Sequence, residues 1–217
     1  MSSFRGYEHL INQLILGDGQ FKKKAASLRA KITQLPREIF SRFKHLVNVN
    51  LCNQRIAQLP PGLSAAHGLQ CLNIAGNPLS QLPADFDGCV DSLEEFDMSG
   101  TAFLAIPDVI FDAKNLLRLR ANHTAITELS SRVGKLKKLQ VLSLSATGLA
   151  HLPQELAECQ ELEQLYLSGI PWIHKNLLSI ENLHEYYEEH PITAAFSREV
   201  SHTAFSREVS RTAFSRE

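Results

Sequence analysis

Cysteine is scarce in this sequence, and its cysteines form no metal-binding or redox motif. The four residues Cys52, Cys71, Cys89 and Cys159 are far apart, and no two of them make a C-x-x-C pair. Neither a zinc site nor a disulfide framework is therefore predicted. Unpaired thiols are typical of a reducing compartment, so we expect a cytoplasmic protein without a bound metal.

Long apolar runs and an excess of one charge are also missing. No run approaches the roughly 20 residues that cross a bilayer, and Arg5, Glu8 and His9 interrupt the first apolar residues. Neither a membrane span nor a secretory signal is predicted. The formal net charge is −1, whereas nucleic-acid-binding proteins usually carry a basic excess. We expect no nucleic-acid partner.

Catalytic signatures are absent as well. A phosphate-binding loop would need glycine where Leu129 precedes Gly134-Lys135, and no kinase signature occurs. Asp97, His123 and either Ser99 or Ser145 contain the residue types of a catalytic triad, but a triad also needs oxyanion donors and shelter from water. We expect these side chains on an open surface, and therefore no enzyme activity, no catalytic residue, no cofactor and no small-molecule substrate.

A repeat dominates the middle of the chain. Its template is L-x-x-L-x-L-x-x-N-x-L-x-x-L-P, and each template position is called a column below. The first column reads Leu46, Leu69, Leu93, Leu116, Leu139 and Leu162. The fourth column reads Val49, Leu72, Phe96, Leu119, Leu142 and Leu165. Apolar and polar residues alternate around the fourth and sixth columns, which indicates a short strand. One repeat cannot bury its own leucines, so the pattern predicts stacked coils with a parallel sheet.

The second half of each repeat predicts a turn and a short outer helix. Proline follows the fourteenth column at positions 36, 60, 83, 107 and 153, and Ser130 is the exception. Proline presets the backbone for a turn, and the remaining stretch has room only for a 3₁₀ or single-turn helix. The ninth column, asparagine in the template, reads Gln54, Asn77, Thr101, Thr124, Thr147 and Ile170. Threonine is expected to replace part of the hydrogen bonding of asparagine.

With successive first-column leucines 23 or 24 residues apart and a Leu-Pro turn, residues 28–172 resemble the intracellular leucine-rich-repeat proteins of the Ras-suppressor, Scribble and Erbin type. The resemblance implies an α/β leucine-rich-repeat solenoid, a curved horseshoe with a concave parallel sheet and short convex helical turns. It also implies a monomeric protein-binding module, a scaffold or regulator in intracellular signalling, whose partner is a small GTPase or another signalling protein. The alternative is the recognition part of a larger GTPase- or kinase-containing protein.

The flanking segments differ from the repeats. Residues 1–27 are expected to form an N-terminal helical cap, because their apolar residues share one helical face before Gly17. Apolar residues recur at helical spacing in residues 173–192, which predicts a C-terminal capping helix. Residues 193–217 repeat a nine-residue unit that is too poor in apolar residues to order, so this tail is expected to be disordered.

The candidate binding site lies between the leucines of the predicted strands, where all side chains are expected to face solvent on the concave side. Glu95 and Asp97 stand one coil before Arg118 and Arg120. These charges either recognise a protein partner or form two cross-strand pairs, Glu95–Arg118 and Asp97–Arg120, and the two roles are compatible. The predicted protein-binding residues are Glu95, Asp97, Arg118, Arg120, Asn122, His123 and Tyr166.

Overall fold

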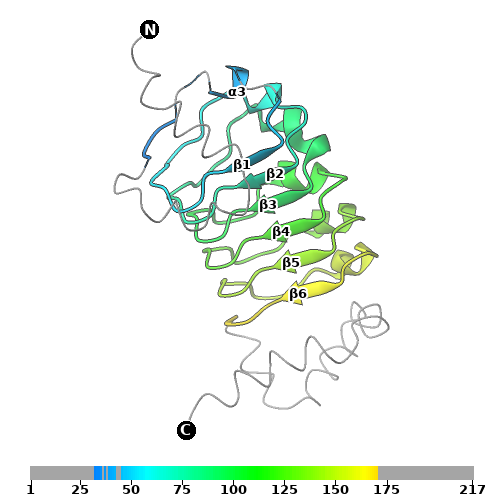
Figure 1. Cartoon of the computed structure of the whole chain (residues 1–217). Helices are drawn as coiled ribbons and strands as arrows, with labels where there is room; N and C mark the ends of the chain where they lie inside the picture. The colour runs from blue at the N-terminus through cyan, green and yellow to red at the C-terminus, as the bar shows by residue number, and fades with distance from the viewer. Residues whose placement is uncertain (1–31, 36, 38, 43–44, 171–217) are drawn as a thin grey trace, which may run out of the picture.

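The computed structural model describes residues 32–35, 37, 39–42 and 45–170. Six three-residue strands form one parallel sheet in chain order (Figure 1). They are β1 Asn48–Asn50, β2 Cys71–Asn73, β3 Glu95–Asp97, β4 Arg118–Arg120, β5 Val141–Ser143 and β6 Gln164–Tyr166. The predicted caps at 1–27 and 173–192 and the tail at 193–217 lie outside the described residues.

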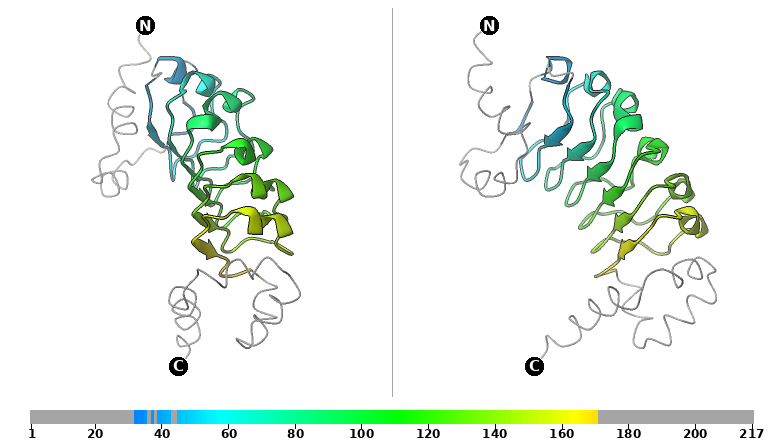
Figure 2. Two further views of the ribbon diagram at one scale, coloured as in Figure 1. Left: turned by 90° about the vertical axis from the view of Figure 1, so that its right-hand side faces the viewer. Right: turned by 45° about the vertical axis from the view of Figure 1, so that its right-hand side comes forward.

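Short helices line the side opposite the sheet. They are the α-helix α3 Ile39–Arg42 and the 3₁₀ helices η2 Leu63–Ala65, η3 Phe86–Ser92, η4 Asp108–Asp112, η5 Ser131–Lys135 and η6 Gln154–Glu158. Figure 2 shows these helices along the outer side of an arc whose inner side is the sheet. Each coil leaves room for only one or two helical turns, so the tighter 3₁₀ form prevails. The predicted solenoid with a concave parallel sheet is confirmed.

The strand register follows the leucine columns. Leu72 lies beside Phe96, Phe96 beside Leu119, and Leu119 beside Leu142. These four side chains are at most 1% exposed, and they belong to one apolar cluster that runs through the described coils. Leu165 continues the column but is only partly buried, since no described coil follows it. Stacking therefore buries what a single coil would leave exposed.

The ninth column holds the turns together from inside. The Asn77 side chain accepts a hydrogen bond from the Ile56 amide at 3.1 Å and donates to the carbonyl oxygen of Leu51 at 2.8 Å, so it links two coils. The threonines act only within their own coil, because each hydroxyl donates to the carbonyl oxygen three residues earlier. The three bonds are Thr101 to Met98 at 2.5 Å, Thr124 to Ala121 at 2.8 Å and Thr147 to Leu144 at 2.7 Å. The predicted partial replacement of asparagine is confirmed.

Ser130 replaces proline without changing the turn. Its backbone angles, φ −61° and ψ 142°, lie close to the values of −57° and 134° at Pro107. Its hydroxyl oxygen accepts a hydrogen bond from the amide of Arg132 at 3.2 Å, which caps η5. A capping serine thus stabilises this turn by a hydrogen bond, whereas proline stabilises it by restricting φ.

Asp85 ties two outer turns together. Its Oδ2 accepts hydrogen bonds from the backbone amide of Gly62 at 2.6 Å and from the hydroxyl of Ser64 at 3.0 Å, both in the preceding coil. Burial opposes ionisation of Asp85, but these donors favour the carboxylate and lower its pKa. The carboxylate form therefore stabilises the stack.

The pH dependence of stability should reveal this link. A lowered folded-state pKa means that the stabilisation is present above the unfolded pKa of about 3.9 and is lost as the pH falls through the folded value. Asp85→Asn cannot ionise, so the difference in unfolding free energy between wild type and Asp85→Asn should be largest near neutral pH and shrink below about pH 4. Urea unfolding over that range measures it. A constant difference would show that the charge of Asp85 contributes nothing.

The register is tested by Leu142→Ala, which should lower the free energy of unfolding by about 2–5 kcal/mol because Leu142 is 0% exposed. The control is Leu104→Ala, since Leu104 is 72% exposed and its loss should change stability by less than about 0.5 kcal/mol. Circular dichroism in increasing urea compares the two variants. Similar small losses in both would contradict the assigned register.

Candidate functional site

The concave face changes in chemistry along the sheet. Between the buried fourth-column residues, β1 and β2 present Asn48, Asn50, Cys71 and Asn73, whereas β3 and β4 present Glu95, Asp97, Arg118 and Arg120. The next two strands present Val141, Ser143, Gln164 and Tyr166. Charge is therefore confined to the two central strands. These strands pair in parallel, with Glu95 beside Arg118 and Asp97 beside Arg120.

The predicted pair between Glu95 and Arg118 is confirmed. Nη1 of Arg118 lies 2.6 Å from Oε1 of Glu95, and the two side chains are 38% and 37% exposed. Nη1 of Arg120 is 3.9 Å from the other carboxylate oxygen of Glu95, which is beyond hydrogen-bonding distance. A partly exposed pair of this kind contributes at most about 1 kcal/mol to stability. Glu95 thus neutralises Arg118 far more closely than Arg120.

The predicted pair between Asp97 and Arg120 is wrong. Oδ1 of Asp97 accepts a hydrogen bond from the backbone amide of Ser99 at 3.0 Å, and no ion pair joins Asp97 to Arg120 within the described coils. The short aspartate side chain reaches an amide two residues ahead, as it commonly does in turns. This local bond orients the carboxylate along its own coil rather than across to the next strand.

Two earlier coils contain the same bond at the fifth column. Asn50 accepts from the amide of Cys52 at 3.1 Å, and Asn73 accepts from the amide of Ala75 at 3.0 Å. Asp97 is the third member of this series. A fifth-column side-chain oxygen therefore satisfies the first turn amide after each of the strands β1, β2 and β3, and these positions have a structural role.

The fourth and fifth coils satisfy this amide differently. Arg120 occupies the fifth column of its coil and has no acceptor atom. The turn amide of Asn122 instead donates to the hydroxyl of Ser99 in the preceding coil at 3.1 Å. In the next coil, the amide of Ser145 donates to Oδ1 of Asn122 at 2.8 Å. In these two coils the acceptor for the turn amide is therefore a seventh-column side chain of the preceding coil, not a fifth-column side chain of the same coil. Arg120 takes no part in this hydrogen bonding.

Asn122 and Ser143 belong to this internal network. Oδ1 of Asn122 also accepts from the hydroxyl of Ser143 at 2.7 Å. Ser143 and Val141 are 7% and 9% exposed although they lie on the concave side. Both are flanked by the longer side chains of β4 and β6, so our expectation that they face solvent is wrong. The seventh column, where Ser99, Asn122 and Ser145 repeat, carries the signal that sequence reasoning missed.

His123 and Tyr166 stand apart from the charged strands. His123 is exposed and lies in the turn after β4 with φ 53°, in the column that holds Gly76, Gly100 and Gly169 in other coils. Tyr166 lies on β6, and its hydroxyl donates to Oε1 of Gln164 at 2.9 Å. The structure therefore brings Glu95, Arg118 and Arg120 together and leaves His123 and Tyr166 at the edges of the surface.

The residue types of a triad are not joined in catalytic geometry. The Asp97 carboxylate binds the amide of Ser99, and the Ser99 hydroxyl accepts from the amide of Asn122. In the coils that the structure describes, no hydrogen bond connects the His123 ring to either residue. These coils contain no group of three or more potential metal ligands, and none of their helices has the length and hydropathy of a membrane span.

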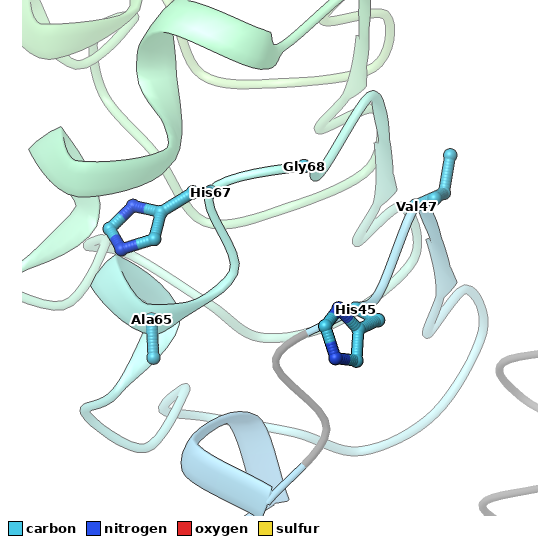
Figure 3. Close-up of a pocket in the computed structure, with 5 residues that line it drawn as sticks. All are labelled: His45, Val47, Ala65, His67 and Gly68. Atoms are coloured by element: carbon cyan, nitrogen blue, oxygen red, sulfur yellow. The ribbon is translucent and has the colours of Figure 1, made fainter.

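A surface hollow of about 590 Å³ lies on the first two described coils, away from the charged strands (Figure 3). Its lining is mostly apolar and comprises His45, Val47, Ala65, His67 and Gly68. Nδ1 of His67 is 3.2 Å from the carbonyl oxygen of Gly88. The two imidazoles are the only titratable side chains of this lining, so the hollow offers little directed polar chemistry.

Comparisons with known proteins identify the repeats. The family model described as Leucine Rich Repeat matches residues 68–89. The probable serine/threonine-protein kinase pats1 of Dictyostelium discoideum is 35% identical over 100 residues, which cover 44% of this chain and 3% of that protein. The adenylate cyclase of Schizosaccharomyces pombe is 34% identical over 130 residues, which cover 58% of this chain and 8% of that protein. This chain thus spans less than a tenth of either relative.

The fold recurs in solved structures. The plant peptide hormone receptor RGFR1, solved in complex with RGF2, has a TM-score of 0.56 and 27% identity. The match covers 64% of this chain and 23% of the receptor. The matched family model, the relatives and this structure agree that the chain carries leucine-rich repeats, and they do not single out the Ras-suppressor, Scribble and Erbin type.

Two substitutions at Asp97 separate its capping role from an ionic one. Asp97→Asn should change the free energy of unfolding by less than about 0.5 kcal/mol, because asparagine makes the same bond at Asn50 and Asn73. Asp97→Ala removes the acceptor and should cost about 1 kcal/mol or more. Chemical denaturation of both variants gives these values. Equal losses in the two would indicate that the charge matters and the cap does not.

Proposed function

We propose that this leucine-rich-repeat solenoid is a monomeric, cytoplasmic protein-binding module that contacts its partner through the concave face of β3, β4 and β5. The observation that carries the proposal is the concentration of Glu95, Arg118 and Arg120 on two adjacent strands. The predicted binding residues Glu95, Asp97, Arg118, Arg120, Asn122, His123 and Tyr166 all lie on this face or at its edge. Asn122 and Asp97 contribute chiefly by shaping it.

The physical properties of the surface favour binding. The side chains project from hydrogen-bonded strands over a fully buried apolar column, so little conformational freedom is lost on association. Arginine is common among the residues that dominate binding energy, and exposed charge speeds encounter with a complementary partner. The similarly folded receptor RGFR1 binds a peptide ligand in its solved complex, which supports recognition of a polypeptide here.

The open surface and the similar proteins favour a scaffold or regulator of signalling rather than a catalyst. Open strands give a nucleophile no shelter from water, and Asp97 and Ser99 both accept hydrogen bonds from turn amides. The two relatives are a kinase and an adenylate cyclase by name, and the matched region is a small part of each. We therefore propose a signalling protein as the partner, and a small GTPase is the candidate that the sequence resemblance favours.

A second candidate is the recognition part of a larger kinase- or GTPase-containing protein. The observation that favours it is the small share of each relative, 3% and 8%, that this chain matches. Sequencing complete transcripts from the native gene tests it. A downstream phosphate-binding loop or kinase signature would support the larger protein, and transcripts that encode these repeats without such a motif would count against it.

The concave site is tested by reversing charge. We expect the double variant Arg118→Glu and Arg120→Glu to weaken binding of the isolated partner at least tenfold, about 1.4 kcal/mol, because it replaces two cations by anions beside Glu95. The partner is first identified by affinity capture with the full chain, and binding is then measured by calorimetry. Circular dichroism must show that the variant is folded.

The matched control reverses the charge of two exposed lysines, Lys114→Glu and Lys138→Glu. They lie in the loops that connect η4 to β4 and η5 to β5. It changes the net charge equally but leaves the concave face intact, so binding should stay within about twofold. Wild-type affinity in the folded Arg118 and Arg120 variant would exclude the concave site. An equal loss in both double variants would indicate an effect of net charge alone.

A further inference from the structure

Most polar side chains at the centre of the concave face already have partners within the solenoid. Glu95 binds Arg118 at 2.6 Å, and Asp97 binds the amide of Ser99 at 3.0 Å. Ser143 donates to Asn122 at 2.7 Å. These bonds occupy hydrogen-bonding groups that the sequence predicted would contact a partner. They leave few free polar groups in the middle of the sheet.

Arg120 is the exception among the polar strand residues of β3, β4 and β5 that face the concave side. Its nearest carboxylate oxygen, on Glu95, is 3.9 Å away, and no hydrogen bond joins its guanidinium to a residue that the structure describes. The side chain is 38% exposed. A guanidinium presents five N–H donors in a fixed plane that matches the two oxygens of a carboxylate. The centre of the surface therefore presents an unused, directional donor.

The fold makes this position available. In the three preceding coils the fifth column holds Asn50, Asn73 and Asp97, each of which caps the turn that follows its strand. In the fourth coil the Ser99 hydroxyl takes over that bond. The residue at position 120 has no acceptor duty, and its identity is not explained by the packing or hydrogen bonding of the solenoid. A residue released from a structural role is a candidate for a binding role.

The surroundings of Arg120 restrict what it can bind. Glu95 and Asp97 stand on the neighbouring strand, so a polyanion such as nucleic acid would be repelled more strongly than a single carboxylate. On the other side lies Ser143, which is 7% exposed, and beyond it Tyr166. Adjacent strands are about 4.8 Å apart, so Tyr166 stands about 10 Å from Arg120, the length of three extended residues.

We propose that Arg120 binds the side-chain carboxylate of an aspartate or glutamate in an extended segment of the partner protein. The same segment places an apolar residue about three positions away, against the ring of Tyr166. The inference rests on the proposed function, because it names the chemistry recognised at the concave face. Arg120 is then the residue that determines specificity. Arg118 is held by Glu95 and helps to position the Glu95 carboxylate.

A displayed library of random 12-residue peptides tests the inference without knowledge of the natural partner. The full chain selects peptides, and those that also bind the Arg118→Glu and Arg120→Glu double variant are discarded. We expect the remaining peptides to share an acidic residue with an apolar residue about three positions away. Their dissociation constants are measured by fluorescence polarisation with synthetic peptides.

A double-mutant cycle then tests the contact itself. Changing the shared acid to its amide, or Arg120→Gln in the chain, should each weaken binding about tenfold, and the two changes together should weaken it little further. Arg120→Lys should restore part of the affinity, because it keeps the charge but loses the planar fork. Lys114→Gln is the control for loss of one positive charge and should leave the affinity unchanged.

The outcomes separate the two proposals. Selected peptides without a shared acid, or losses that multiply in the cycle, would overturn the role of Arg120 while leaving the concave site intact. Recovery only of peptides that bind the double variant equally well, or of none at all, would count against both the concave site and this inference. An unchanged melting temperature for Arg120→Gln, which breaks no described hydrogen bond, establishes that the losses do not arise from unfolding.

Discussion

The length of each strand constrains the whole molecule. A strand of three residues is not stable by itself. Every coil therefore depends on parallel pairing with the coils beside it and on the apolar column that they bury together. That pairing fixes which side chains lie next to one another across the sheet. It also leaves an unpaired amide where each strand turns outward, and a buried or half-buried amide must find an acceptor. The way this chain satisfies those amides decides which concave residues are available to a partner.

Two solutions to the same requirement divide the concave face. In the first three coils a fifth-column oxygen caps its own turn, as Asn73 does. In the fourth and fifth coils a seventh-column side chain of the preceding coil takes over, as Ser99 and Asn122 do. The change coincides with the arginines of β4. We infer that the fifth-column positions have a structural duty in the first three coils, and that the binding chemistry is concentrated at β4, where the fifth column is released from it.

Leucine spacing was enough to predict the sheet, its register and the outer helices, because buried columns leave only one alignment of the coils. The same spacing could not predict side-chain partners. It placed Asp97 beside Arg120 correctly, but the aspartate had a nearer donor in the amide of Ser99. His123 stands where three other coils have glycine, and that column would have indicated a turn. The burial of Ser143 depends on the lengths of neighbouring side chains, which the repeat pattern does not encode.

The central claim concerns which face of the solenoid meets the partner, and hydrogen exchange of the complex measures this most directly. Amide exchange in the full chain is compared with and without the bound partner, peptide by peptide. Concave binding predicts slower exchange in segments that contain β3, β4, β5 and the turns after them, while segments that contain η3, η4 and η5 exchange as in the free chain. Protection confined to those outer helices, with unchanged exchange in the segments that contain β3, β4 and β5, would contradict a concave binding site.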